Sequence, residues 1–328
     1  MEYFPKVTIV VCIWNVEKTI HKAVDAILAQ TYENLEIILM DDESPDRCPQ
    51  ICEEYAKKDG RVIALHKKDE GLAMARNFAM ARATGEYITF FDPDDWVELD
   101  GIENMVRTAV DNNADMVICD YFHNDQYRQT YAKQTPSALD HWSVLEDIAT
   151  GKLFGYCWNK LIRLKLIQNI GATFPKGFYC DDQYMMCTLL KEDIKVSYLP
   201  KAYYHYVYGS ASLSRRYDEN SFRQDTIIRD SFYLLLKDTP SADSIYRSKN
   251  NSIFSRAFLF GKNVYTSDQF REKFASFNKK DFWGSYGFPI SWFYRFALNG
   301  KYHFSRNLFA LFFYIKQLYK KAFGWFRF

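Results

Sequence analysis

Residues 85–96 read GEYITFFDPDDW, an apolar run that ends in a cluster of carboxylates. The run Tyr87–Phe91 is typical of a buried strand, so the cluster is expected at the carboxyl end of that strand. Asp92 and Asp94 lie two residues apart in the following loop, where both can bind one hard cation together with water and phosphate oxygens. Pro93 fixes its own φ and stiffens the loop. The stretch therefore predicts a site for Mn²⁺ or Mg²⁺.

A helix N-cap is the alternative interpretation of these carboxylates. Asp94 or Asp95 would then precede a helix beginning near Trp96 and accept hydrogen bonds from its first N–H groups. Three carboxylates in four residues exceed what a cap requires. A metal site is therefore favoured, and Asp95 can cap a helix beside it.

The chain before and after this strand alternates between two patterns. Short β-branched or aromatic runs are typical of strands, and runs with apolar residues three or four apart are typical of helices. The predicted strands cover residues 7–13, 35–40, 62–65, 87–91 and 116–119, with helices near 20–28, 53–58, 72–82 and 105–110. This order predicts an α/β fold whose mainly parallel sheet has helices on both faces. Ligands bind beyond the carboxyl ends of such strands, where the pairs Asp41-Asp42 and Asp92/Asp94 fall.

The second half of the sequence is less regular. Residues 122–145 are polar and predict a loop or insertion, and residues 154–170 predict a strand or a pair of short helices. A helix over 182–190 and short strands over 196–199 and 203–208 follow. Beyond about residue 215 the pattern is helical to the end, so we expect a domain over 1–215 and a helical region over 216–328.

Composition excludes several classes of protein. With 48% hydrophobic and 25% charged residues, the chain is expected to fold. Its net charge of +1 gives no field that favours nucleic acid. The seven cysteines form no C-x-x-C pair, which indicates reduced thiols in a cytoplasmic protein. No signal peptide, 18-residue apolar span, G-x-G-x-x-G or P-loop motif is present.

Four segments in this order resemble family 2 glycosyltransferases: residues 7–17, 30–46, 71–77 and 85–96. The resemblance is close over residues 5–120 and looser to about 215. It implies a GT-A fold, with a nucleotide-sugar half over 1–120 and an acceptor half over 121–215. It also implies inverting transfer from a nucleotide-diphospho-sugar, usually a UDP-sugar, to a hydroxyl group.

The resemblance implies roles for individual residues on the donor side. Asp94 would be the main ligand of the metal, and Asp92 would face the sugar or ribose and assist Asp94. Arg76 would lie near the nucleotide or the diphosphate. The nucleoside would contact Ile13, Asn15, Asp41 and Asp42. Cys12 and Trp14 stand where the family usually has Pro and Tyr, a departure that bears on the choice of nucleotide.

Each donor-side residue also has a simpler interpretation. Asp41 and Asp42 could belong to a turn that caps a helix starting near Asp46. Arg76 could be a cation on the surface of a helix. Asn15 could cap a helix that begins near Glu17.

The segments 156–162 and 179–183 resemble the acceptor half of the same family. There a Glu-Asp pair opens a helix and its Asp is the catalytic base, so Asp182 would be the base and Asp181 would replace the Glu. Trp158 would also lie on the acceptor side. The alternative is that both aspartates only cap the helix to Leu190. His205 could complete the metal shell, although a lone histidine between tyrosines is more often structural.

The C-terminal segment is basic and rich in aromatic residues. Residues 282–328 contain seven Lys/Arg, nineteen aromatic residues and no acidic residue. Such amphipathic helices lie at membrane interfaces, which predicts a protein at the inner face of the cell membrane with a glycan or lipid-linked acceptor. The alternative is packing on the catalytic domain or on a second subunit of a homo-oligomer. A nucleotidyltransferase and a non-catalytic binding or scaffold protein remain as rival functions.

Overall fold

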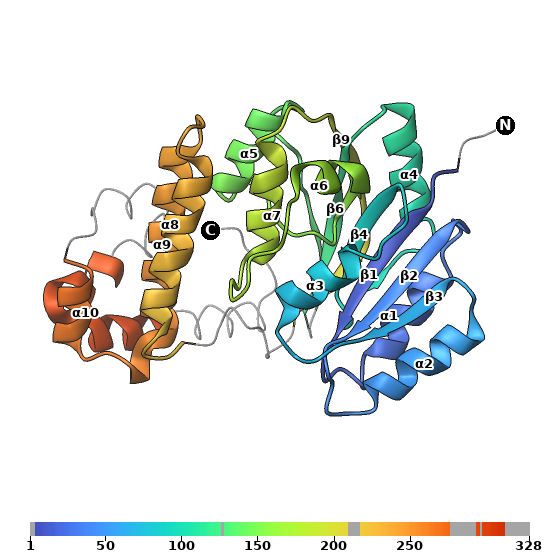
Figure 1. The fold of residues 1–328 in the computed structure, drawn as a ribbon. Helices are drawn as coiled ribbons and strands as arrows, with labels where there is room; N and C mark the ends of the chain where they lie inside the picture. Colours follow the sequence, from blue (N-terminus) through green and yellow to red (C-terminus); the bar gives the residue numbers. More distant parts are fainter. Residues whose placement is uncertain (1–3, 126–127, 209–216, 276–292, 296, 312–328) are drawn as a thin grey trace. The chain divides into compact units, whose positions relative to one another are not determined.

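The computed structural model describes residues 4–125, 128–208, 217–275, 293–295 and 297–311. Contacts within the chain divide it into two units (Figure 1). Unit 1 contains residues 1–210 and 238–241, and unit 2 contains residues 211–237 and 242–328. Each unit is described by itself below.

The first part of unit 1 is a parallel sheet of four strands in the order β3-β2-β1-β4. These strands are β1 (Val7–Ile13), β2 (Leu35–Asp41), β3 (Val62–His66) and β4 (Tyr87–Phe91). They alternate along the chain with α1 (Ile20–Leu28), α2 (Cys48–Lys58) and α3 (Leu72–Met80). All residues of β1, β2 and β4 are buried, as expected for strands covered on both faces. The predicted strands and their parallel arrangement are confirmed here.

The second part of unit 1 extends the same sheet with mixed directions. The strand order continues β4-β8-β6-β9-β5, with β7 paired to β6. Here β8 runs antiparallel to β4 and β6, whereas β9 runs parallel to β6. The strands are β5 (Trp96–Val97), β6 (Met116–Asn124), β7 (Gln129–Ala132), β8 (Lys160–Arg163) and β9 (Val196–Val207). The helices are α4 (Gly101–Asp111), α5 (His141–Ala149), α6 (Leu164–Ile170) and α7 (Asp181–Leu190).

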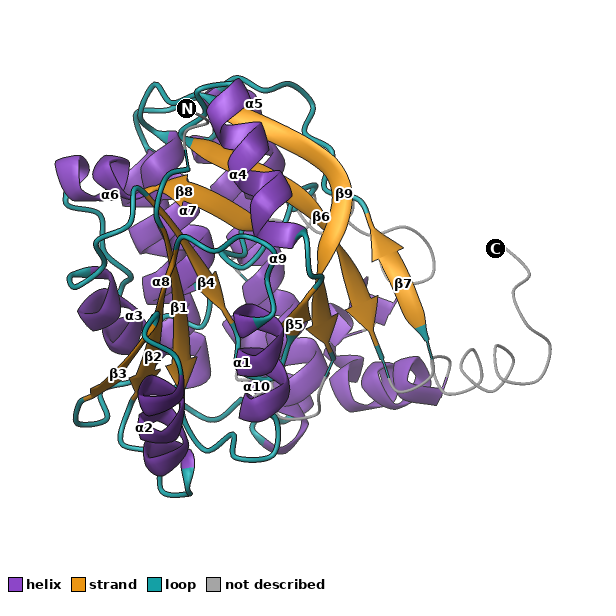
Figure 2. Cartoon of the chain, turned by 90° about the vertical axis from the view of Figure 1, so that its right-hand side faces the viewer, coloured by secondary structure: helices purple, strands orange, loops and turns teal. Residues whose placement is uncertain are grey.

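Two predictions for this part were wrong in detail. The segment predicted as a loop over 122–145 contains the end of β6, all of β7 and the start of α5. The two short strands predicted over 196–208 form one strand, β9, which Figure 2 shows as a long curved arrow. Its register against β6 shifts between Leu199 and Ala202. Pro200 lies at this irregularity. Proline has no N–H to donate to a neighbouring strand, so within sheets it is found where the regular pairing is interrupted.

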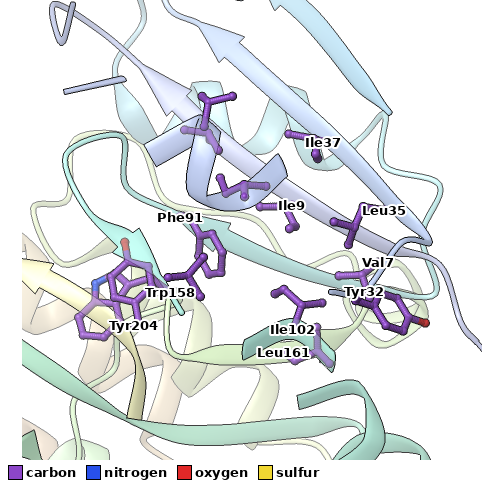
Figure 3. Packing of buried hydrophobic residues seen from close by; sticks show 14 of the residues in the cluster. Val7, Ile9, Tyr32, Leu35, Ile37, Phe91, Ile102, Trp158, Leu161 and Tyr204 are labelled. Carbon is purple, nitrogen blue, oxygen red and sulfur yellow. The ribbon is translucent and has the colours of Figure 1, made fainter. Parts of the chain in front are cut away.

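The core of unit 1 lies between the sheet and its helices. Ile9 and Ile37 are paired across β1 and β2, and Figure 3 shows them among the buried side chains. At one end of the cluster, Phe91 packs against Tyr204, and Trp158 stacks on Tyr204. Truncating one such buried aromatic residue typically costs about 3–5 kcal/mol. The seven cysteines are free thiols, as the sequence indicated.

Unit 2 is built from helices around aromatic side chains. It contains α8 (Ser221–Leu236), α9 (Ala242–Phe260) and α10 (Ser267–Lys273). Residues 302–311 are also helical. Tyr302 is fully buried in the unit's hydrophobic cluster, and the partly buried Phe309 packs against that cluster. In the described part of the predicted basic tail, Tyr302 and Phe309 thus pack in unit 2, whereas Phe304 and Leu311 are exposed. Residues 312–328 lie outside the described residues. No helix of the described part is long and apolar enough to cross a membrane.

Candidate functional site

The centre of the site is Arg76, a buried residue of α3 that is only 4% exposed. Its Nη1 lies 2.9 Å from Asp181 Oδ2 and 3.9 Å from Asp182 Oδ1, and its Nη2 lies 3.6 Å from Asp92 Oδ1. These carboxylates come from the loop after β4 and from the first turn of α7. A buried guanidinium is stable only when carboxylates compensate its charge. The interpretation of Arg76 as a surface cation is therefore wrong.

Asp92 and Asp94 occupy the loop after β4, as predicted from the sequence. The backbone N–H of Asp92 donates to Tyr204 Oη at 3.0 Å, and its side chain is 31% exposed. Burial, with Asp94 and Asp181 nearby, raises the pKa of Asp92 to about 6 although Arg76 opposes the shift. Asp94 is exposed, and no described residue forms an ion pair with it.

Asp95 does not cap a helix. The chain continues from it into β5, and the next helix, α4, begins only after Asp100. Asp95 is buried, and its Oδ1 accepts a hydrogen bond from the backbone N–H of Val207 at 2.6 Å. This hydrogen bond connects the acidic loop to the end of β9.

Asp182 is a largely buried carboxylate with a raised pKa. Burial is the main cause that raises its pKa to about 7, the charges of Asp181 and Asp92 add to the increase, and Arg76 opposes it. Its side chain is 16% exposed, so a small group can reach it. A base is most effective when its pKa lies near the working pH. The residue at the N-cap of α7 is Cys180, and it makes no side-chain cap hydrogen bond. Asp181 and Asp182 therefore do not cap α7, but both lie in its first turn, where negative charge favours the helix dipole.

The carboxylates at the end of β2 are held by neighbouring groups. Asp41 accepts from the N–H of Ser44 at 3.1 Å and lies 3.1 Å from His66 Nδ1. Asp42 lies 2.7 Å from Lys67 Nζ and accepts from the N–H of Gly71 at 3.1 Å. The N-cap of α2 is Arg47, so the two aspartates do not cap that helix.

The end of β1 presents a different kind of surface. The Ile13 side chain is buried in the core, and its carbonyl accepts from the N–H of Asp42 at 3.0 Å. Trp14 and Asn15 are exposed, and Asn15 has a left-handed φ of 55°. Helix α1 begins at Ile20 with Thr19 as its N-cap, so the capping interpretation of Asn15 is wrong. Any ligand at this edge would meet Trp14 and Asn15 rather than the Ile13 side chain.

Two residues expected at the site have structural surroundings. Trp158 is buried and stacks on Tyr204 with ring centroids 4.5 Å apart. His205 stacks on Trp96 at 3.4 Å, and its Nε2 lies 2.9 Å from Glu98 Oε1. Its Nδ1 lies 3.3 Å from the side-chain nitrogen of Asn124. A histidine needs a free nitrogen lone pair to bind a metal, and both nitrogens of His205 already have partners.

Lys160, for which the sequence predicted no role of its own, holds the backbone of the aromatic segment beside the site. This lysine is buried, and its Nζ donates to the carbonyls of Phe154 and Tyr156 at 3.0 and 2.7 Å and to Asn159 Oδ1 at 2.8 Å. Burial lowers the pKa of Lys160 to about 8. The segment 156–162 resembles the acceptor half of the family, but nothing in its sequence indicates that its lysine is buried.

The residues at the site fit a divalent cation that arrives with a phosphate ligand. No group of three or more His, Cys, Asp or Glu side chains in the described residues forms a complete metal cage. Mg²⁺ is commonly bound by one or two carboxylates together with substrate phosphates, and Asp94 and Asp92 supply such a pair. Arg76 is the one cation within ion-pair distance of Asp92, Asp181 and Asp182 in the described chain, so the site as a whole remains negative.

The sequence profile of glycosyl transferase family 2 matches residues 8–171. The chain belongs to this family. The match contains the strand ends and the acidic loop described above. It stops before α7, so the Asp181-Asp182 pair lies outside it.

Proteins similar in sequence to this family 2 protein include named glycosyltransferases. It is 35% identical over 230 residues to the putative glycosyltransferase EpsH of Bacillus subtilis, a match that covers 66% of this chain and 65% of EpsH. It is 31% identical over 225 residues to the glycosyltransferase GlyA of Streptococcus pneumoniae, covering 65% of this chain and 32% of GlyA. The chain therefore spans less than two thirds of the length of these relatives.

Among solved structures, the fold is similar to that of S. aureus TarS residues 1–349 in complex with UDP-GlcNAc. The TM-score is 0.66 at 18% identity, over 92% of this chain and 89% of that one. The likeness is one of fold and confirms the predicted GT-A architecture.

Proposed function

We propose that this protein is a metal-dependent inverting glycosyltransferase whose donor is a nucleotide-diphospho-sugar of the UDP-sugar class. One observation carries the proposal: Arg76 joins Asp92, from the acidic loop, to Asp182, a partly exposed carboxylate whose pKa lies near 7. The loop and the start of α7 are 90 residues apart in the sequence. In this proposal they supply the cation-binding group and the general base of one site.

Asp182 accepts the proton of the acceptor hydroxyl in this proposal. As the proton moves to the carboxylate, the acceptor oxygen attacks C1 of the sugar from the face opposite the diphosphate. The bond between C1 and the diphosphate oxygen breaks, and the nucleotide diphosphate leaves with that electron pair. A single displacement inverts the anomeric centre, through a transition state that resembles those of inverting glycosidases.

Asp94, assisted by Asp92, would hold Mn²⁺ or Mg²⁺ beside the diphosphate. When bound, the cation would supply positive charge that stabilises the leaving nucleotide. The electrostatics of the site support this role, because a diphosphate approaching several carboxylates and one guanidinium is repelled unless a cation accompanies it. Asp41, Asp42, Trp14 and Asn15 would form the nucleoside side of the donor site.

The acceptor is proposed to be a glycan or a lipid-linked glycan of cell-surface polysaccharide synthesis. The basic, aromatic C-terminal segment supports contact with the inner face of the cell membrane, where such acceptors are found. The proposal does not require a membrane-spanning helix, since cationic amphipathic segments bind anionic lipid from the side.

A panel of nucleotide-sugars tests the function directly. With Mn²⁺ and no acceptor, one of them should be hydrolysed slowly to sugar and nucleotide diphosphate. Cleavage at the nucleotidyl group, as in a nucleotidyltransferase, would instead give a nucleoside monophosphate and the sugar 1-phosphate, and a scaffold protein would release nothing. Absence of hydrolysis and of transfer across the whole panel would reject the proposal.

Asp182→Asn tests the assignment of the base. Proton transfer to a positioned base contributes about 10²–10⁴-fold to a rate, so kcat for sugar transfer should fall on that scale. Calorimetry should show that the variant still binds the donor, because Asp182 contacts the acceptor. Asp111→Asn, at an exposed residue near the end of α4, serves as the control. Near wild-type turnover by Asp182→Asn would remove this residue from the mechanism.

A further inference from the structure

Four aromatic rings form a stack beside the site. Successive ring centroids are 5.1 Å apart from Phe154 to Tyr156, 4.8 Å from Tyr156 to Trp158 and 4.5 Å from Trp158 to Tyr204. The interplanar angles of these contacts are 15°, 18° and 11°. The rings therefore follow one another with nearly parallel faces.

The two ends of the stack have different surroundings. At the inner end, the buried Tyr204 accepts a hydrogen bond through its Oη from the backbone N–H of Asp92 at 3.0 Å. At the outer end, the Phe154 side chain is 42% exposed. The stack thus extends from the acidic loop to the surface, where it presents an aromatic ring to solvent.

The outer rings are held firmly in place. Lys160 donates to the carbonyls of both Phe154 and Tyr156, and the N–H of Phe154 donates to Gln134 Oε1 at 2.9 Å. A phenylalanine on a mobile loop would lose side-chain and backbone entropy on binding a ligand. Here folding has already fixed the backbone on both sides of the ring.

The same segment packs directly on the helix that carries the proposed base. A Cβ added at Gly155 would lie 2.8 Å from the Cα of Gln183, the residue that follows Asp182. Only a glycine allows so close an approach. Tyr156 follows Gly155 directly, and Phe154 stacks on its ring. The contact at Gly155 therefore brings both residues next to the first turn of α7.

We propose that Phe154, supported by Tyr156, binds the acceptor sugar by stacking on the apolar face of its ring. This assignment rests on the proposed function, because it takes Asp182 as the group that receives the acceptor's proton. Trp158, which the sequence predicted on the acceptor side, stacks on the ring of Tyr156. The stack then connects the acceptor sugar to the backbone of the donor loop.

A sugar ring fits this surface better than a lipid chain does. One face of a pyranose presents C–H groups that pack on an aromatic ring, while its rim carries hydroxyls that need polar partners. The exposed ring of Phe154 offers the apolar contact, and the adjacent Gly155 packs on Gln183, the residue after the partly exposed Asp182. An acyl chain would desolvate that carboxylate without giving it a hydrogen bond.

The test uses the full chain and three probes: methyl glycosides of glucose, galactose and N-acetylglucosamine. Saturation-transfer NMR should show binding of at least one glycoside through its ring C–H protons. Phe154→Ala should raise the dissociation constant about tenfold, as expected for the loss of one ring contact, and Phe154→Trp should restore binding. Phe4→Ala serves as the control, because Phe4 is also exposed, at 57%, but precedes the amino end of β1.

Acceptor-independent hydrolysis of the nucleotide-sugar separates this proposal from the proposed function. Phe4→Ala should leave that hydrolysis within about twofold of wild type, so hydrolysis tests the proposed function without involving Phe154. Equal glycoside binding by wild type and Phe154→Ala, or no binding by wild type, would overturn the assignment even if hydrolysis is normal. Phe154-dependent binding of 1-octanol without binding of any glycoside would also overturn it, in favour of a lipid chain. If no nucleotide-sugar is hydrolysed but glycosides bind through Phe154, the proposed function fails and the sugar-binding surface stands.

Discussion

The raised pKa of Asp182 comes from its surroundings in the folded chain rather than from the carboxyl group itself. Its usual pKa of 3.8 is raised to about 7, chiefly by burial. The group must be ionised to accept a proton. Its folded-state pKa also exceeds the unfolded value, so the native state binds more protons between these pH values and Asp182 lowers stability as the pH rises through that window.

The activity of the wild-type protein should therefore depend on pH near neutrality. Below about pH 7, kcat should fall roughly tenfold per pH unit, because the ionised fraction of Asp182, which can accept a proton, falls by that factor. The measurement is kcat at saturating donor and acceptor from pH 5 to pH 9. The residual activity of Asp182→Asn should lack this acid limb. An identical acid limb in that variant would assign the titration to another group.

Asp94 should be required for nucleotide binding that depends on a divalent cation. Asp94→Ala removes the exposed carboxylate of the acidic loop, so calorimetry with a nucleoside diphosphate should lose the extra affinity that Mn²⁺ gives to wild type. Asp111→Ala is a suitable control, since it also removes an exposed aspartate. If Mn²⁺ increases nucleotide affinity as much in Asp94→Ala as in wild type, Asp94 is not a ligand of the metal.

At Gly155, the Phe154–Tyr156 segment lies in close backbone contact with α7. Gly155→Ala should destabilise the protein by about 1–3 kcal/mol, because its methyl group would meet the backbone of Gln183. Gly60→Ala is the matched control: nothing lies within 4 Å of the added Cβ, and its φ is not left-handed. Urea unfolding followed by circular dichroism measures both. Equal stability of the two variants would show that the segment moves away freely.

The strands of the first half could be predicted because each is a local apolar run. Val7–Ile13 and Tyr87–Phe91 match their predicted bounds, and the carboxylates at the strand ends follow from parallel order alone. The antiparallel position of β8 and the continuity of β9 depend on pairing with β6, a partner distant in sequence. Pro200 also interrupts the local pattern although the strand continues through it.

Prediction of the site was limited for the same reason. The motifs indicated Asp92 and Asp182, but burial of Arg76 between them is a tertiary property that no spacing within α3 reveals. Histidine is a common metal ligand, so the sequence alone allows that role for His205. In the folded chain its ring nitrogens contact Glu98 and Asn124, and its ring face stacks on Trp96.

The whole chain should bind anionic vesicles at low salt if the proposed membrane contact is correct. Sedimentation should decrease as salt is added and as Lys316, Lys320, Lys321 and Arg327 are replaced by Gln, since each cation contributes roughly 1 kcal/mol near an anionic surface. Neutral vesicles are the control. A full-length protein that stays in the supernatant with anionic vesicles at low salt would contradict the membrane contact.

The ion pairs of Arg76 also bear on how the sequence can diverge. A substitution at Asp92 changes the charge felt by Asp182, and a substitution at Asp181 changes the charge felt by Asp92, because all of them share one guanidinium. Effects of substitutions in contacting groups are not additive. Donor and acceptor specificity in this protein should therefore evolve by correlated changes, with Arg76 as the position through which a mutation on one side is compensated on the other.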